Sequence, residues 1–390
     1  MTTTIIIAIC VLLLLAYFFD LTSSKSKIPS VILLLFLGYI VNQITQYFLI
    51  KIPDLNAVLP LLGMVGLILI VLEGSLELEL NKSKMPIIAK TTLMAILPLL
   101  YFSVVLALLF EHFGNLSFKC GLANAIPIAV VSSSIAIPTA QNLDGNSREF
   151  VTYESSLSDI FGVIFFNFIT LNEEFTSNIF STFSFEILLV LLVSFFATIS
   201  LAYLLSRIKH HIKYIPIILM VVLIYAVSKH YHLPALVFIL FFGIFLGNLN
   251  ELKENRFIQR LKPDILDTEV YKFKELTTEI TFLIRSIFFL VFGFLINTQE
   301  LLNTETIFWA VGICAAIFLI RYLFLKGFNL SVTPLVYIAP RGLITILLFL
   351  SIPASQTSEL VNKSLIIQII ILTALVMMFG MMFNKKKLSV

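Results

Sequence analysis

The chain has 390 residues, of which 59% are hydrophobic and only 13% are charged, with a formal net charge of +3. Its mean hydropathy is +1.02. A soluble protein of this length needs many more charged residues to cover its surface, so a soluble fold is excluded. Apolar runs of about 18 or more residues recur from end to end, and each is long enough to cross a hydrocarbon layer about 30 Å thick. The sequence therefore predicts an all-α polytopic membrane protein, with a single transmembrane domain over residues 1–390.

The apolar runs predict about thirteen spans. The first run lacks the basic segment and small-residue cleavage site of a signal peptide, so we expect it to be a retained span. The one long polar stretch, residues 249–275, carries six basic and six acidic residues and is predicted to be a cytoplasmic loop, either a solvated connector or a regulatory surface. In chain order, the expected spans cover about residues 3–19, 30–49, 57–76, 86–110, 120–142, 149–171, 184–206, 214–229, 233–248, 277–297, 306–323, 333–352 and 364–383.

The basic residues of the predicted loops indicate how the chain is oriented. With the N-terminus outside, the inner loops hold Arg148, Lys326, the lysines of the tail, and the lysines and arginines of residues 25–27, 82–90, 207–213 and 253–274. The outer loops then hold only Lys51, Lys119, Lys229 and Lys363. Because basic residues favour the cytoplasmic side, we expect a multi-pass protein of the cell membrane with an outer N-terminus and a cytoplasmic C-terminus.

Two segments of the chain resemble each other and predict an inverted repeat. "ILIVLEGSLELEL" (68–80) and "FLVFGFLINTQELL" (289–302) are apolar runs with a central glycine and a Glu-Leu end, and the expected topology orients them oppositely. Pairing spans 1–6 with 8–13 aligns two interrupted spans: "VSSSIAIPTAQN", with Pro138, and "APRGLITILL", with Pro340. Broken helices in corresponding positions of two halves predict an ion site near the membrane midplane.

Among the charged residues within or at the edge of the apolar spans, the candidates for function are Glu154, Asp159, Arg285, Arg321 and Arg341. A buried carboxylate avoids its desolvation cost by binding a proton or a cation, or by pairing with an arginine. We expect Glu154 to form a permanent structural pair with Arg321 or Arg341. Asp159 is then the exchangeable carboxylate.

Hydroxyl groups accompany Asp159 in the sequence. Ser155 lies one helical turn before it, Ser158 precedes it directly, and Ser133 and Ser134 lie in the predicted break of the fifth span. Hydroxyls and freed backbone carbonyls are hard oxygen donors, suited to dehydrated Na⁺ or K⁺. These five residues form the predicted cation- and proton-binding site. The cysteines and histidines have no metal-ligand spacing, so we expect neither a transition metal nor a cofactor.

Several motifs resemble those of bacterial monovalent cation:proton antiporters. In "ESSLSD", Glu154 and Asp159 match the E-S-L-x-N-D stretch of that superfamily, as does the first serine, while Ser158 stands where Asn is usual. "SSSIAI" is similar to the broken fifth helix, "VLEGSLEL" to the third and "PRGLITILLFL" to the Arg-Gly twelfth, and Arg285 falls where a basic residue of the tenth helix is expected. The sodium-exchanging branch usually has Thr-Asp-Pro in the fifth helix, whereas this chain has Ile135 in place of the Asp. This hydroxyl-rich helix without a carboxylate looks more like that of the potassium-linked branch. That branch, however, carries Gln rather than Ser before its Asp. The choice among Na⁺, Li⁺ and K⁺ therefore stays open.

The resemblance implies a secondary-active antiporter, not an enzyme, that exchanges Na⁺ or K⁺ for H⁺ by alternating access. It implies a moving core of about residues 86–171 and 306–383, and a scaffold of about residues 1–80 and 184–297 that forms a homodimer. Phe36, Phe241 and Phe242 are candidates for the dimer face or for lipid contact. One exchangeable carboxylate predicts 1:1 electroneutral exchange, because arginine at 285 cannot release a proton. A titrating Glu154 would instead make exchange electrogenic.

Two other classes of protein were weighed. A membrane-embedded enzyme would need an embedded Ser/His or paired-Asp constellation, or an Asp-rich magnesium motif, and the spans carry neither. A cation channel or a non-transporting ion sensor on the same fold is the alternative. Replacing Asp159 by Asn distinguishes the classes, because it should abolish exchange in an antiporter but only alter selectivity in a channel.

Overall fold

The computed structural model describes residues 2–383, except residues 27, 51, 53, 56–57, 79, 82–83, 142, 172–178, 208–209, 211, 232–234 and 253–262. Within these residues every regular element is helical and no strand occurs, which confirms the predicted all-α class. The elements are α1 (Thr2–Ser26), α2 (Ser30–Tyr47), α3 (Val58–Glu77), α4 (Met85–Gly114), α5 (Phe118–Ala129), α6 (Ser133–Ala140), α7 (Gly145–Leu171), α8 (Ile179–Arg207), α9 (Tyr214–His230), α10 (Ala235–Gly247), η2 (Leu249–Leu252), α12 (Pro263–Phe294), α13 (Thr298–Leu301), α14 (Thr304–Gly327), η3 (Leu335–Tyr337), α15 (Leu343–Leu350), η4 (Ala354–Gln356) and α16 (Lys363–Phe383).

Many of these helices can cross a membrane. Among the described residues, nine helical runs are long and apolar enough, with α5 and α6 counted as one run, and α9 and α10 are shorter apolar helices. The protein is therefore a multi-pass membrane protein. Each predicted span overlaps a described helix. The number of spans, about thirteen, stays a prediction.

The prediction of a loop over residues 249–275 was wrong for the last part of that range. Helix α12 begins at Pro263, and residues 253–262 lie outside the described residues. Leu266, Val270, Phe273 and Thr277 are buried at spacings of four, three and four, so they form one face of the helix. The charged residues between them lower the local hydropathy, which hid this amphipathic start of α12 from a search for apolar runs.

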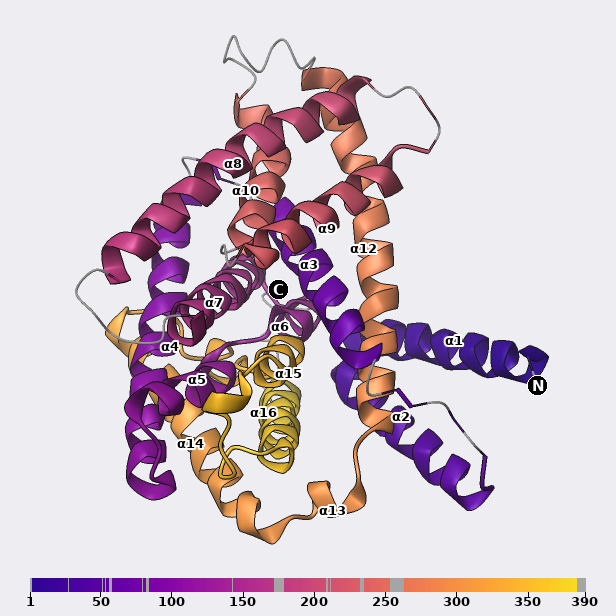
Figure 1. The fold of residues 1–390 in the computed structure, drawn as a ribbon, viewed down its shortest axis with the longest axis vertical. Coiled ribbons are helices and arrows are strands. Elements are labelled where there is room, and N and C mark those ends of the chain that lie inside the picture. The colour runs from indigo at the N-terminus through magenta and orange to yellow at the C-terminus, as the bar shows by residue number, and fades with distance from the viewer. Residues whose placement is uncertain are drawn as a thin grey trace, which may run out of the picture.

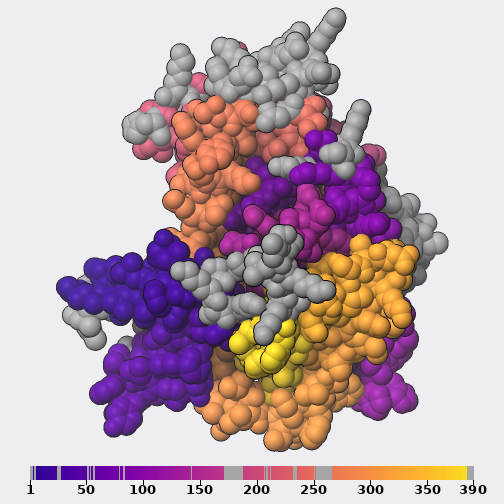
Figure 2. Space-filling model, turned by 180° about the vertical axis from the view of Figure 1, so that it is seen from behind, coloured from indigo at the N-terminus to yellow at the C-terminus, as the bar shows by residue number. Residues whose placement is uncertain are grey.

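The helices pack in two groups (Figure 1). Helices α2, α3, α8, α10 and α12 contact one another in one group, and α4, α5, α6, α7, α14 and α16 do so in the other. Helix α1 contacts α2, α6 and α12, and Figure 2 shows it reaching away from the body. The division of the chain into a scaffold and a core stays a prediction. Movement of the core against the scaffold stays a prediction.

The central glycines of the two similar segments both lie where helices approach closely. A Cβ atom on Gly293 of α12 would lie 2.3 Å from the carbonyl oxygen of Leu35 in α2. A Cβ atom on Gly74 of α3 would lie 2.9 Å from Oγ of Ser156 in α7. Glycine is required at the first position because a backbone oxygen cannot move aside as a side chain can.

Aromatic packing corrects one expectation for the molecular surface. Phe242 is fully buried, with its ring centroid 6.1 Å from that of Phe238 and 6.3 Å from that of Phe273. It therefore cannot form a dimer face or contact lipid. Phe241 is half-buried and Phe36 is exposed. The interior position of Phe242 follows from the contact of α10 with both α8 and α3.

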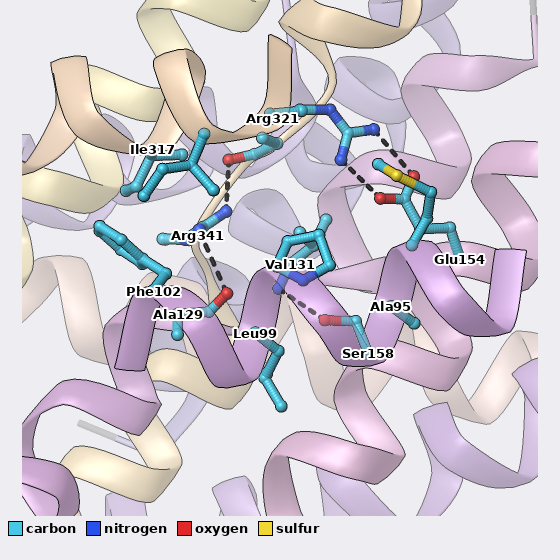
Figure 3. Close-up of a pocket in the computed structure, with 14 residues that line it drawn as sticks. Ala95, Leu99, Phe102, Ala129, Val131, Glu154, Ser158, Ile317, Arg321 and Arg341 are labelled. Carbon is cyan, nitrogen blue, oxygen red and sulfur yellow. Dashed lines mark hydrogen bonds and ion pairs between the residues drawn. The ribbon is translucent and has the colours of Figure 1, made fainter. Parts of the chain in front are cut away.

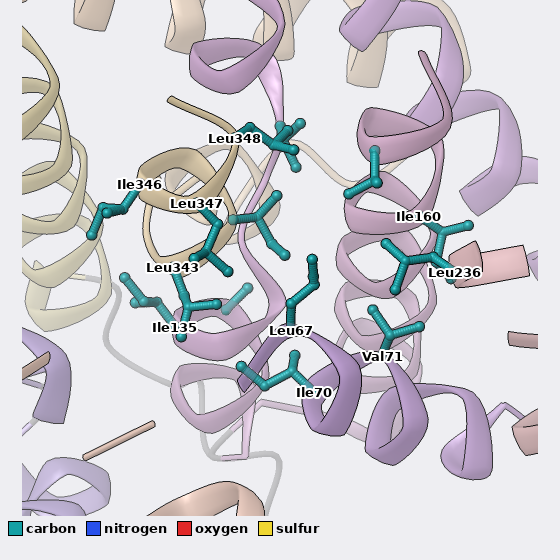
Figure 4. Close-up of a cluster of buried hydrophobic side chains, with 14 of the residues drawn as sticks. Leu67, Ile70, Val71, Ile135, Ile160, Leu236, Leu343, Ile346, Leu347 and Leu348 are labelled. Atoms are coloured by element: carbon teal, nitrogen blue, oxygen red, sulfur yellow. The ribbon is translucent and has the colours of Figure 1, made fainter. Parts of the chain in front are cut away.

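An apolar seal joins the two helix groups (Figure 4). All of its side chains are buried: Leu67, Ile70, Val71, Ile135, Ile160, Leu236, Leu343 and Leu347. They come from α3 and α10 on one side and from α6, α7 and α15 on the other. Along α3, the seal residues come before Glu73 and Glu77. The seal therefore occupies the middle of α3, on the N-terminal side of those two carboxylates.

Candidate ion-binding site

Two interrupted helices cross at the centre of the fold. Helix α5 ends at Ala129 and α6 begins at Ser133, while α15 begins only after the irregular residues 338–342. The backbone N–H of Ser132 donates to the carbonyl of Pro340 at 2.9 Å, so the two interruptions touch through backbone atoms. A Cβ atom on Gly342 would lie 2.8 Å from the side chains of both Ile135 and Ser132. The two interrupted segments can come this close because residue 342 has no side chain.

Asp159 of α7 lies beside this crossing and is 1% exposed. Its Oδ2 atom accepts hydrogen bonds from the backbone N–H of Ser133, at 3.2 Å, and from the Ser133 hydroxyl. The carboxylate thus lies at the N-terminus of α6, where the helix dipole and free N–H groups favour an anion. Its Oδ1 atom has no hydrogen-bond partner among the described residues. One oxygen of Asp159 is therefore held and the other is free to bind a proton or a cation.

Ser158 stabilises the break itself. Its Oγ atom accepts a hydrogen bond from the backbone N–H of Val131 at 3.0 Å, within the irregular residues between α5 and α6. An unpaired N–H group in the membrane interior is costly, and this bond satisfies it. Ser158 therefore contributes to the predicted site by holding the backbone of the interrupted helix.

The other two predicted serines bond elsewhere. The Ser155 hydroxyl donates to the carbonyl of Val151 at 2.7 Å, within its own helix. Ser134 and Ser132 share a hydrogen bond of 2.9 Å between their hydroxyls. Both predicted residues lie near the crossing, but these bonds do not connect them to Asp159.

Glu154 and Arg321 form a buried ion pair (Figure 3). Nη1 of Arg321 lies 2.5 Å from Oε1 of Glu154, and Nη2 lies 2.8 Å from Oε2. The exposed fractions are 2% for Glu154 and 5% for Arg321. Nε of Arg321 also donates to the carbonyl of Leu335 at 2.7 Å. Of the two predicted partners, Arg321 therefore holds Glu154, and the pair links α7 to α14 and η3.

Arg341, the other predicted partner, binds backbone carbonyls instead. Its Nε donates to Ile128 at 2.6 Å, its Nη2 to Ala129 at 3.2 Å and its Nη1 to Ala339 at 2.8 Å. Ile128 and Ala129 end α5, where unpaired carbonyls carry the negative end of the helix dipole. Arg341 is therefore the alternative that does not pair with Glu154, because the interrupted helix has its own need for a cation.

A cavity of about 370 Å³ reaches this region from one side. It opens between α1, α3, α6 and α12, and its lining includes Ser133, Glu73 and Arg285. The remaining charged side chains of its lining are Asp20, Glu77 and Glu279. Nη2 of Arg285 lies 3.9 Å from Oδ1 of Asp20, so the predicted basic residue belongs to the wall of the cavity.

Glu73 is a residue of the site that sequence reasoning missed. It lies within an apolar helix, directly before Gly74, and lines the same cavity as Ser133. The signal was present, because a lone carboxylate inside an apolar run is costly unless it faces a polar space. The segment indicated only the repeat and the resemblance to the third helix of the superfamily, and Glu73 was given no role.

On the other side of Ser158 lies a much smaller cavity, of about 30 Å³ (Figure 3). Its lining includes Glu154, Ser158, Arg321 and Arg341. This volume holds only one or two water molecules. Of these two cavities, the acidic one gives the wider access to the crossing.

A buried carboxylate at the crossing of two broken helices, reached by a one-sided cavity, defines a secondary transporter of cations. The sequence matches the family described as "Sodium/hydrogen exchanger, transmembrane" over residues 9–385, and the chain belongs to this family of cation/proton antiporters. The predicted family is thereby confirmed.

The fold is similar to two structures of the sodium proton antiporter MjNhaP1 from Methanocaldococcus jannaschii. The structure at pH 8 has a TM-score of 0.70 and 20% sequence identity, over 98% of each chain. The electron-microscopy structure has a TM-score of 0.68 and 18% identity, over 98% of this chain and 95% of the other. A search of curated proteins found no match.

Proposed function

We propose that the protein exchanges one monovalent cation, Na⁺ or K⁺, for one proton, and that Asp159 binds the two ions in turn. The observation that carries this proposal is the free Oδ1 of Asp159, at a site buried to 1% exposure beside an acidic cavity. A carboxylate that carries H⁺ and one that carries M⁺ have the same charge. Only such a neutralised site can cross the membrane interior cheaply.

The proposal includes alternating access between the two helix groups. In this structure the acidic cavity gives access from the side of Glu77, and the apolar seal closes the opposite side. From the distribution of basic residues, we assign the cavity to the cytoplasmic side. A channel would need a continuous polar path, and the apolar seal argues against one.

Two further carboxylates need roles that leave the stoichiometry at 1:1. Both oxygens of Glu154 are bonded to Arg321, so in this proposal Glu154 is a structural group. Glu73 belongs to α3 in the scaffold group, so it attracts cations to the cavity without moving with Asp159. A homodimer formed by the scaffold, implied by the family resemblance, is part of the proposal and can be checked by native mass spectrometry from mild detergent.

The proposal is tested by proton flux from acid-loaded proteoliposomes after addition of Na⁺ or K⁺. We expect cation-triggered alkalinisation of the lumen with the wild-type protein and none with Asp159→Asn. The amide is neutral, so it neither takes up a proton nor offers a negative charge to a cation. Asp54→Asn, the same change in an outer loop, is the matched control and should transport normally. Absence of flux with either cation, or normal flux in Asp159→Asn, would refute the proposal.

A further inference from the structure

Ser156 has a buried hydroxyl that the described fold does not use. Its side chain is 5% exposed, and its Oγ atom has no hydrogen-bond partner among the described residues. Hydroxyls inside helices usually donate to the carbonyl one turn earlier, as Ser155 does to Val151 at 2.7 Å and Thr170 does to Phe166 at 2.9 Å. An unpaired buried hydroxyl is destabilising, so a ligand bound at Ser156 would use a donor and acceptor that no described residue satisfies.

The second unpaired oxygen of this region lies close by on the same helix. Asp159 follows Ser156 by three residues on α7, and residues at this spacing have Cβ atoms about 5–6 Å apart on one face. Ser156 Oγ and Asp159 Oδ1 are therefore two free oxygens about one turn apart. Side chains at this i, i+3 spacing can bind one ion together, as the Glu-x-x-His motif does in helical metal sites.

The position of Ser156 connects these oxygens to the acidic cavity. Across the boundary between the two helix groups, α3 places Gly74 against Ser156, where a Cβ atom would lie 2.9 Å from Oγ. Gly74 lines the cavity, as does Ser133, whose hydroxyl donates to Asp159. Ser156 thus lies directly against Gly74 in the wall of the cavity, although it is not itself part of the lining.

We propose that Ser156 is a further ligand of the transported cation, which it binds together with the free Oδ1 of Asp159. This inference rests on the proposed function. A neutral hydroxyl oxygen is a hard donor that replaces one water of hydration of Na⁺ or K⁺. A proton on Asp159 needs only the carboxylate. Ser156 therefore increases the affinity for the cation without changing the affinity for the proton.

The test compares Ser156→Ala with the wild type in cation-dependent proton flux at two pH values. We expect the KM for Na⁺ or K⁺ to rise about three- to tenfold, the loss of one ligand bond, with kcat changed less than twofold. The rise should be the same factor at both pH values, because competition by protons is unaltered. Ser103→Ala is the matched control: it removes another fully buried hydroxyl without a partner, on α4, and should leave KM unchanged.

A second variant and a binding measurement separate coordination from packing. Ser156→Cys keeps nearly the same shape against Gly74 but replaces a hard oxygen by a soft sulfur, so it should raise KM as Ser156→Ala does. In detergent, the cation concentration that half-saturates thermal stabilisation should rise by the same factor in both variants, which reports binding without transport.

Three outcomes would overturn the inference: an unchanged KM in Ser156→Ala, a wild-type KM in Ser156→Cys, or a change in KM that differs between the two pH values. If these occur while Asp159→Asn is inactive, only the role of Ser156 fails. If the wild type itself exchanges no cation for protons, the proposed function fails.

Discussion

Glu154 and Asp159 lie five residues apart on one helix and have opposite surroundings. Both oxygens of Glu154 are bonded to Arg321, whereas Asp159 keeps Oδ1 unpaired. The bidentate guanidinium leaves Glu154 no acceptor for a transported ion, while the N-terminus of α6 holds only one side of Asp159. This difference in local bonding is the basis for assigning one carboxylate to structure and the other to transport.

At the residue scale, breaking the Glu154–Arg321 pair should destabilise the protein. Arg321→Ala leaves a buried carboxylate without its cation, and we expect a loss of about 3–5 kcal/mol in the free energy of unfolding. Arg321→Lys should lose less stability than Arg321→Ala but should still be less stable than the wild type, because an ammonium cannot form the two parallel bonds. Thermal unfolding in detergent measures both.

The double variant Glu154→Gln/Arg321→Ala serves as the control for this prediction. It removes both charges, so its loss should be smaller than the sum of the two single losses, which is the signature of a coupled pair. Additive losses would show that the pair contributes no interaction of its own.

At the scale of the elements, proline, glycine and serine predicted where the two helices break. The serines at 132–134 and the Pro340–Gly342 segment lie at the two breaks, because serine and glycine ease a break and proline removes a backbone donor. Pro138 lies inside α6 and does not interrupt it. The partner of Arg341 could not be read in the same way. Which groups Arg341 binds depends on how the end of α5 packs against the segment around Arg341, more than 200 positions later. A single sequence does not reveal this packing. The amphipathic start of α12 was missed because its buried face alternates with charged residues.

Replacing Arg341, which caps the end of α5, should destabilise the protein. Arg341→Lys keeps the charge but cannot donate to Ile128, Ala129 and Ala339 together, so at least one carbonyl loses its donor. We expect a loss of about 1–3 kcal/mol in the free energy of unfolding. The exposed Arg148→Lys is the control and should unfold as the wild type does. If both variants unfold alike, the guanidinium does not stabilise the end of α5.

At the scale of the whole molecule, the acidic cavity and the apolar seal adjoin along α3, where Ile70 belongs to both. Composition and spacing predicted a polytopic transporter, but they could not predict which side is open. That property depends on how α3 and α10 pack against α6, α7 and α15. The same contacts would have to separate and form anew in each transport cycle.

Exchange by one carboxylate should be independent of the membrane potential. A net transported charge would respond to voltage by about 2.3 kcal/mol per 100 mV, whereas 1:1 exchange moves none. We therefore expect no steady transport current when the cation concentration is raised on a solid-supported membrane, although proton flux occurs in the same vesicles. Vesicles with gramicidin provide the positive control for charge movement. A sustained current would mean that Glu154 or Glu73 carries a second proton.

The single carboxylate at the helix crossing also sets a limit on the gradients that the proposed exchange can maintain. Ile135 and Gly342 lie at the crossing and have no ionisable side chain. In the proposed exchange, Asp159 is therefore the carboxylate that binds either one cation or one proton there. Net exchange would stop when the concentration ratios of the two ions are equal, and a tenfold cation ratio would balance a difference of about one pH unit. The acidity of a compartment bounded by this membrane would then follow its cation ratio and not its voltage.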